Sequence, residues 1–192
     1  MSVWTFALAY LNHRHHRRTK KGRLLSGIVI GGLFAMSLTV FTESLLYRVG
    51  GISFYTLAKA GSLIPLGVFF AGALQGVVYE YVGSIALGQW YYPTVHHRRH
   101  LFLLLPFFWA LFMVIMQDTY AICRAGGLDT AISFAITALI PFALIEGINV
   151  YTKSWVYQRL LRSVPMLIIG WFILAYTFVY IFNQHVVNIF SY

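Results

Sequence analysis

Long apolar runs separated by short polar segments are the dominant pattern of this chain. A helix needs roughly 17–25 apolar residues to cross a bilayer. Five runs approach or exceed that length, covering residues 24–47, a stretch within 61–92, 101–117, 130–151 and 164–190. The pattern predicts an all-α, polytopic transmembrane helical bundle of about five spans, with residues 24–192 forming a single domain. The second run is longer than one span requires, so we expect it to tilt, to break near Gly83 or Gly88, or to protrude. The fifth is expected to bend near residues 183–185.

The N-terminal segment, residues 1–23, differs from the rest of the chain. Residues 1–12 are apolar but too short to cross a bilayer, and the basic run follows them instead of preceding them as in a cleavable signal. We therefore expect a short interfacial helix. Residues 13–23 carry six Lys/Arg and three His, which indicates a cytoplasmic anchor on anionic lipid. A His-rich metal or partner site is the alternative, although it lacks an acidic or cysteine partner.

The composition agrees with a membrane protein and narrows its expected partners. Hydrophobic residues make up 59% of the chain and charged residues 10%, whereas soluble domains have about 45–50% and about 25%. The single cysteine, Cys123, excludes an intrachain disulfide and makes a cysteine-based metal site implausible. The net charge of +9 comes from basic residues at the ends of apolar runs, where they contact lipid headgroups. We expect membrane lipids, an apolar small molecule or pigment, and membrane proteins as partners, but no nucleic acid, metal or cofactor.

Five spans place the two termini on opposite sides of the membrane. One side then holds the N-terminal segment and the loops after the second and fourth spans, and it carries 11 Lys/Arg residues against 3 on the other side. Because basic residues accumulate in cytoplasmic loops, the N-terminus is predicted to be cytoplasmic and the C-terminus external. We expect the inner membrane of a bacterium or archaeon.

Two carboxylates inside apolar runs, Glu80 and Glu146, are the main functional clue. An ionisable residue at the centre of a bilayer costs a few kcal/mol on insertion scales and usually has a function or a partner. Each glutamate precedes an aromatic cluster at a similar distance, with Trp90 ten residues after the first and Trp155 nine residues after the second. The first two pairs of spans therefore resemble two copies of one helical hairpin followed by a single helix, although chance is an open alternative.

Helical periodicity places both glutamates on polar or small-residue faces. Gly72, Gly76, Glu80 and Gly83 share one face, a pattern typical of close helix contact, and Glu146 lies one turn from Asn149. We treat Glu80 and Glu146 as candidate catalytic residues, an acid and a base. The candidate substrate-binding residues are Gln75, Tyr79, Asn149, Trp90, Trp155 and Tyr157. Two structural alternatives stay open: the glutamates hold helices together by hydrogen bonds, and the aromatic clusters form an interfacial belt. Trp109 and Trp171 are expected to face lipid or the core.

The combination of intramembrane glutamates with following Trp/Tyr clusters resembles the membrane-integral carotenoid cyclases and hydratases. Two stretches carry this resemblance, one with Glu80, Trp90 and Tyr92, the other with Glu146, Trp155 and Tyr157. It implies carboxylates that protonate a polyene and aromatic faces that stabilise the resulting cation.

Two functions of different classes follow from these observations. The first is an enzyme that binds an apolar isoprenoid or lipid substrate between its helices and isomerises, cyclises or hydrates it by acid/base chemistry. The second is a non-catalytic membrane subunit of a larger complex, or the substrate-binding component of a transporter. In that case the glutamates join helices or bind a ligand.

Overall fold

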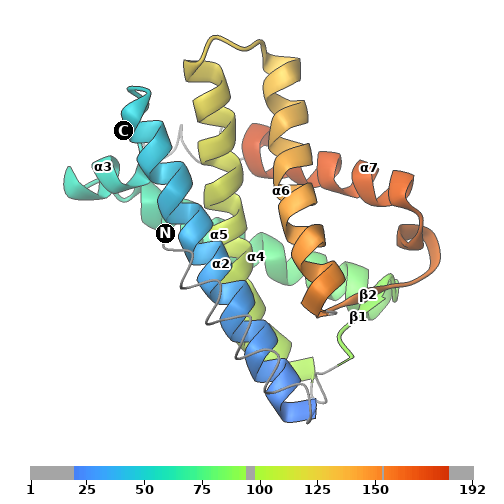
Figure 1. Ribbon diagram of the computed structural model, residues 1–192. Helices are drawn as coiled ribbons and strands as arrows, with labels where there is room; N and C mark the ends of the chain where they lie inside the picture. Colours follow the sequence, from blue (N-terminus) through green and yellow to red (C-terminus); the bar gives the residue numbers. More distant parts are fainter. Residues whose placement is uncertain (1–19, 94–97, 153, 182–192) are drawn as a thin grey trace.

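The computed structural model describes residues 20–93, 98–152 and 154–181 (Figure 1). The interfacial helix and most of the basic run predicted for the N-terminus lie outside these residues, as does the bend expected near 183–185.

The described chain is mostly helical, as predicted. Its elements in order are α2 (Lys20–Arg48), α3 (Phe54–Lys59), α4 (Ile64–Tyr79), the π-helix η1 (Glu80–Ala86), β1 (Trp90–Tyr91), α5 (Arg98–Ala125), α6 (Thr130–Thr152), β2 (Val156–Tyr157), the 3-10 turn η2 (Arg159–Arg162), α7 (Val164–Ala175) and the π-helix η3 (Tyr176–Ile181). The two short strands, which the sequence patterns did not predict, pair with each other in antiparallel fashion.

Three helices in the described part of the chain are long and apolar enough to cross a membrane, judged by length and composition. They cover Ile64–Ala86, Leu105–Ala125 and Thr130–Val150, and Val164–Tyr180 is a shorter apolar helix. The first joins α4 to η1 and ends just before Gly88, whose φ of 57° turns the chain. The expected end of the third run at residue 117 is wrong, because α5 continues to Ala125 with Asp118 buried inside it.

The helix α5 lies at the centre of the molecule and packs against α2, α4 and α6 (Figure 1). Its most extensive contact is with α4, and it also touches η3. In Figure 1, α4 and α7 run behind α5 and α6 and cross them steeply. The side chain of Gln117 donates a hydrogen bond to the carbonyl of Phe178 and so connects α5 to η3.

The small residues of α4 form the close contact that the sequence predicts. Gly72 and Gly76 are buried, and a Cβ atom at Gly72 would lie 2.8 Å from Cβ of Met113 on α5. A Cβ atom at Gly76 would overlap the side chain of Trp109 on the same helix. Glycine is required at both positions because the α5 side chains occupy the space of a methyl group.

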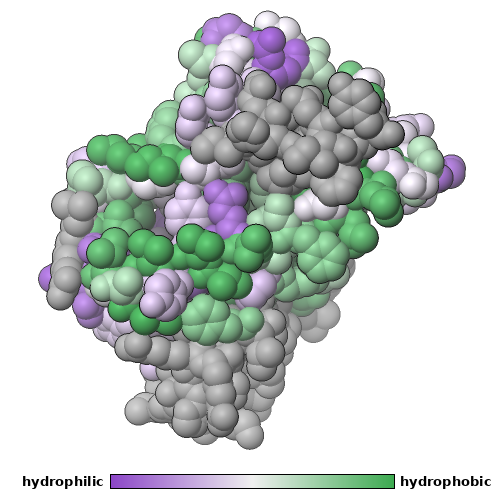
Figure 2. Space-filling view, turned by 180° about the vertical axis from the view of Figure 1, so that it is seen from behind, coloured by the Kyte–Doolittle hydropathy of each residue, from purple (hydrophilic) through white to green (hydrophobic). Residues whose placement is uncertain are grey.

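The opposite face of α4 is apolar and exposed. Four large side chains spaced four residues apart are 53–68% exposed, namely Leu66, Phe70, Leu74 and Val78. Apolar side chains also cover much of the described surface in Figure 2. Exposed apolar area on this scale is typical of a surface that faces lipid or another protein, and it is compatible with a membrane location.

Candidate functional site

The carboxylate of Glu80 accepts hydrogen bonds from three aromatic side chains. The Glu80 residue begins the π-helix η1 and is 4% exposed. Its Oε1 accepts from the hydroxyl of Tyr92 at 2.6 Å and from Nε1 of Trp109 at 3.2 Å, and its Oε2 accepts from Nε1 of Trp90 at 3.1 Å. An indole N–H can only donate, so these partners satisfy Glu80 as a hydrogen-bond acceptor.

Local backbone geometry brings Trp90 back onto Glu80. A π-helix is wider than an α-helix and often occurs at functional sites. After it ends, Gly88 adopts a positive φ and the N–H of Gln89 donates to the carbonyl of Gly83 at 2.7 Å. The Trp90 indole then covers Gly83 so closely that a Cβ atom there would overlap the ring. The absence of a side chain at Gly83 therefore permits the bond between Trp90 and Glu80.

The carboxylate of Glu146 on α6 has a similar set of partners. Its Oε1 accepts from the hydroxyl of Tyr157 at 2.6 Å and from Nε1 of Trp171 on α7 at 3.2 Å. Glu146 itself is half-buried. Asn149, one turn later, accepts a hydrogen bond from the backbone N–H of Trp155 at 3.1 Å through Oδ1. Each glutamate thus joins its own helix to the next strand and to the next helix.

The two clusters meet at the β1–β2 pair. Trp90 pairs with Tyr157 and Tyr91 with Val156, and the rings of Trp90 and Tyr157 meet edge to face with centroids 6.5 Å apart. Each strand belongs to a Trp-x-Tyr triplet, and the two central residues, Tyr91 and Val156, pair with each other. Antiparallel pairing of equivalent residues gives the two clusters an approximate local two-fold axis through this pair.

Burial keeps the two tyrosines as hydrogen-bond donors. It raises the pKa of Tyr92 well above the ordinary tyrosine value, and the nearby charge of Glu80 raises this pKa further. The pKa of Tyr157 is raised for the same reasons, burial first and then the charge of Glu146. Both hydroxyls therefore remain protonated at neutral pH and donate to their glutamates.

The other predicted substrate-binding residues, Tyr79, Trp155 and Gln75, are at least half-buried in the described structure. Tyr79 stacks on Trp109 with centroids 5.8 Å apart, and its hydroxyl hydrogen-bonds Oγ1 of Thr177 at 2.9 Å. Trp155 is half-buried against the apolar core, and Gln75 is half-buried on α4. Tyr79 and Trp155 therefore pack against the apolar core.

Sequence reasoning missed the two tryptophans one helix further along the chain. Trp109 and Trp171 were expected to face lipid or the core, whereas both donate their indole N–H to a glutamate. The sequence did contain a signal for these bonds. Each tryptophan lies in the apolar helix after an intramembrane carboxylate, and its indole N–H needs an acceptor when it is buried.

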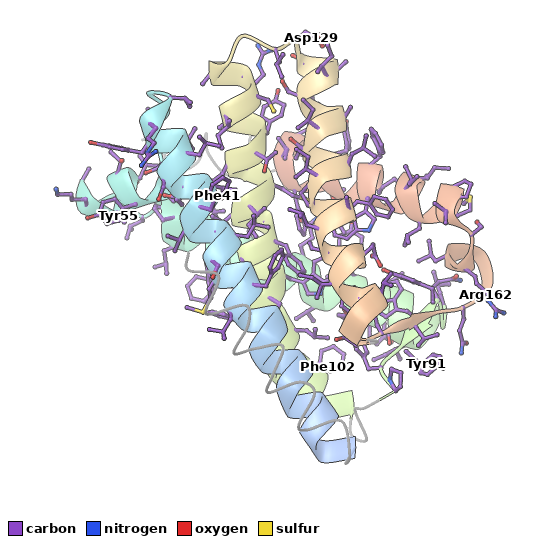
Figure 3. All side chains as sticks on the ribbon, viewed as in Figure 1. Phe41, Tyr55, Tyr91, Phe102, Asp129 and Arg162 are labelled. Atoms are coloured by element: carbon purple, nitrogen blue, oxygen red, sulfur yellow. The ribbon has the colours of Figure 1, made fainter. Side chains whose placement is uncertain are left out.

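A surface cavity of about 350 Å³ lies beside the strand pair. Its lining residues are Tyr91, Val156, Tyr157, Gln158 and Arg162. Figure 3 shows Tyr91 and Arg162 on the same side of the molecule. Neither glutamate lines this cavity, although Tyr157 contacts both the cavity and Glu146.

Within the part of the chain that is described, no group of three or more His, Cys, Asp or Glu side chains could hold a metal ion.

The comparisons with known proteins give no family or relative on which to base a function. No protein-family model matches the chain, and neither the curated proteins nor the solved structures contain a match.

Proposed function

We propose that this chain is a non-catalytic integral membrane protein, a subunit of a larger complex or a binding component, in which Glu80 and Glu146 hold the helices together. The observation that carries this proposal is the donor set of Glu80. Three donors from β1, the segment after it and α5 occupy both carboxylate oxygens. A catalytic acid or base must exchange its proton with a substrate within hydrogen-bond reach, and here aromatic donors occupy that space.

The proposed topology is five spans with a cytoplasmic N-terminus. In this proposal the other two spans, besides the three long apolar helices, are α2 and the combination of α7 with η3. The 29 residues of α2 would extend about 43 Å at 1.5 Å per residue, which exceeds the bilayer core of about 30 Å. The excess of Lys/Arg on one side supports the orientation. The β1–β2 pair then lies at the cytoplasmic interface, and the Trp-x-Tyr triplets are the inner ends of two repeated units.

A second candidate function keeps an isoprenoid or lipid ligand, as the resemblance to carotenoid cyclases and hydratases implies. One observation favours it: Tyr157 lines the surface cavity and also donates to Glu146. An amphiphile bound in that cavity would contact the hydroxyl that donates to the half-buried Glu146 carboxylate. Acid/base chemistry would require this donor to move away from Glu146 during the reaction.

The experiment that separates these functions uses the tagged full-length chain, purified in mild detergent from its native membrane. Co-purified proteins are identified by mass spectrometry and extracted lipids by chromatography. We expect a stoichiometric protein partner and no enriched isoprenoid. The variant Glu146→Gln should retain the partner, because glutamine keeps the acceptor oxygen that Tyr157 and Trp171 use. An isoprenoid that is converted by the wild type and not by a stably folded Glu146→Gln variant would contradict the proposal.

A further inference from the structure

A second buried carboxylate, Asp118 on α5, belongs to neither glutamate cluster. Its side chain is 1% exposed. Oδ2 accepts a hydrogen bond from Oγ1 of Thr42 on α2 at 2.8 Å, whereas Oδ1 is buried without a hydrogen-bond partner among the described residues. A buried carboxylate oxygen without a donor is costly, so this atom requires an explanation.

The neighbour of Thr42 along the chain, Glu43, provides one. Glu43 is half-buried, and its two oxygens accept the backbone N–H groups of Phe54 and Tyr55 at 2.9 Å each. These bonds attach the first turn of α3 to α2. The carboxyl groups of Glu43 and Asp118 also interact with each other. Both Glu43 oxygens already accept N–H donors, so Glu43 as it stands offers Asp118 no donor.

The hydroxyl of Thr42 lies within hydrogen-bond distance of two acceptor oxygens but can donate to only one of them. Its oxygen lies 2.8 Å from Oδ2 of Asp118 and 3.1 Å from the carbonyl oxygen of Thr39, but it has a single proton to donate. Two adjacent carboxylates removed from water cannot both be ionised without a large cost. One added proton on Asp118 would supply a donor between the two interacting carboxyl groups and would remove the repulsion.

We propose that Asp118, Glu43 and Thr42 form a proton-binding site in which one proton is shared between the two carboxyl groups. Of the helices packed on α5, α2 contributes Glu43, whereas α4, α6 and η3 contribute no charged group that interacts with Asp118 among the described residues. The basic residues at this end are exposed, and one of them, Arg124, donates to the carbonyl of Leu128 at 2.7 Å. The shared proton therefore neutralises the charge of Asp118.

The site links protonation to the position of α3. When the proton leaves, two negative charges lie in contact, and Glu43 is the member closer to solvent. Its displacement breaks the bonds to Phe54 and Tyr55 and releases α3 from α2. This inference is independent of the proposed function, because it uses none of the residues in the Glu80 and Glu146 clusters.

Infrared difference spectroscopy of the purified full chain tests the proton directly. The carbonyl band of protonated carboxylic acid is recorded from mildly acidic to alkaline pH in wild type, Asp118→Asn and the control Asp129→Asn, which changes an exposed acid. We expect wild type and the control to show a band, equivalent to one carboxyl group, that Asp118→Asn lacks. Equal bands in wild type and Asp118→Asn would overturn the proposal. So would loss of the wild-type band on adding sodium at constant pH, which would assign the site to an alkali cation.

A spin label on α3 tests the coupling. The label is placed at Ala58→Cys, an exposed position, after Cys123 has been replaced by alanine. We expect label mobility to rise at alkaline pH with Asp118 present and to stay constant with Asp118→Asn, since asparagine can donate to Glu43 at every pH. A rise of equal size in both proteins would overturn the coupling. If Asp118→Asn fails to fold, the test relies on wild type alone. A carboxylic acid band or a label mobility that does not change with pH would then contradict the proposal.

Discussion

Replacing Glu80 or Glu146 by glutamine removes the same charge from two similar clusters, but the two substitutions should differ in cost. Glutamine retains one acceptor oxygen and replaces the other with an NH₂ group that only donates. Both aromatic donors of Glu146 bond to Oε1, so one orientation of glutamine preserves these two bonds. The Asn149 side chain also interacts with this carboxylate. Glu80 uses both oxygens, so every orientation of glutamine points NH₂ at a donor.

The magnitude follows from the least costly orientation at position 80. Keeping Oε1 for Tyr92 and Trp109 places the new NH₂ group against Nε1–H of Trp90, which lies 3.1 Å from Oε2. This loses a hydrogen bond to a charged group and leaves a buried donor unpaired, a cost of about 1.5–3 kcal/mol. The loss of charge weakens the remaining bonds in both variants. We therefore expect Glu80→Gln to be less stable than Glu146→Gln by about 1.5–3 kcal/mol.

The assay is reversible unfolding of the purified proteins in mixed micelles, with increasing fractions of a denaturing detergent and intrinsic tryptophan fluorescence as the signal. Wild type and both variants are compared at the same protein-to-detergent ratio. Equal unfolding midpoints for the two variants would refute the assigned hydrogen bonds. A less stable Glu146→Gln would do so as well.

Two further predictions concern the same region. Gly83→Ala should destabilise the protein by about 1–3 kcal/mol through overpacking, because its methyl group would overlap the Trp90 indole. The control Gly147→Ala should have little effect, since a Cβ atom there would meet no atom within 4 Å. Similar unfolding midpoints for both variants would contradict this packing. The raised pKa values of Tyr92 and Tyr157 contribute stability that is fully present below the unfolded tyrosine value of about 10 and is lost as pH rises through the folded values. Absorbance titration should accordingly detect two tyrosines that ionise only on alkaline unfolding, and their ionisation in the folded protein near the ordinary value would disprove this.

The helical period was sufficient to predict the contact face of α4. Small residues that recur every four positions identify a close approach whichever helix is opposite, and Gly72 and Gly76 contact α5 as expected. The polar partners of Glu80 and Glu146 could be predicted only in part. Trp90 and Tyr157 follow their glutamates closely in sequence, but Trp109 and Trp171 depend on how one helix packs on the next, which periodicity does not specify.

Other differences between sequence and structure have similar physical causes. The third apolar run was expected to end at residue 117, just before Asp118. A hydroxyl from α2 instead allows Asp118 to lie inside the helix. The strands β1 and β2 are two residues long, too short to give an alternating pattern. Their pairing depends on the two aromatic clusters meeting in space.

The residues at the centre of the strand contact, Tyr91 and Val156, differ from each other. In a homodimer with a two-fold axis, the contact at the axis joins a residue to its own copy. Here Tyr91 faces Val156, a combination that two identical chains could not place on their axis. Carrying both halves in one polypeptide frees each half to change alone. It also allows Arg162, which belongs to one half alone, to line the surface cavity beside the strand contact.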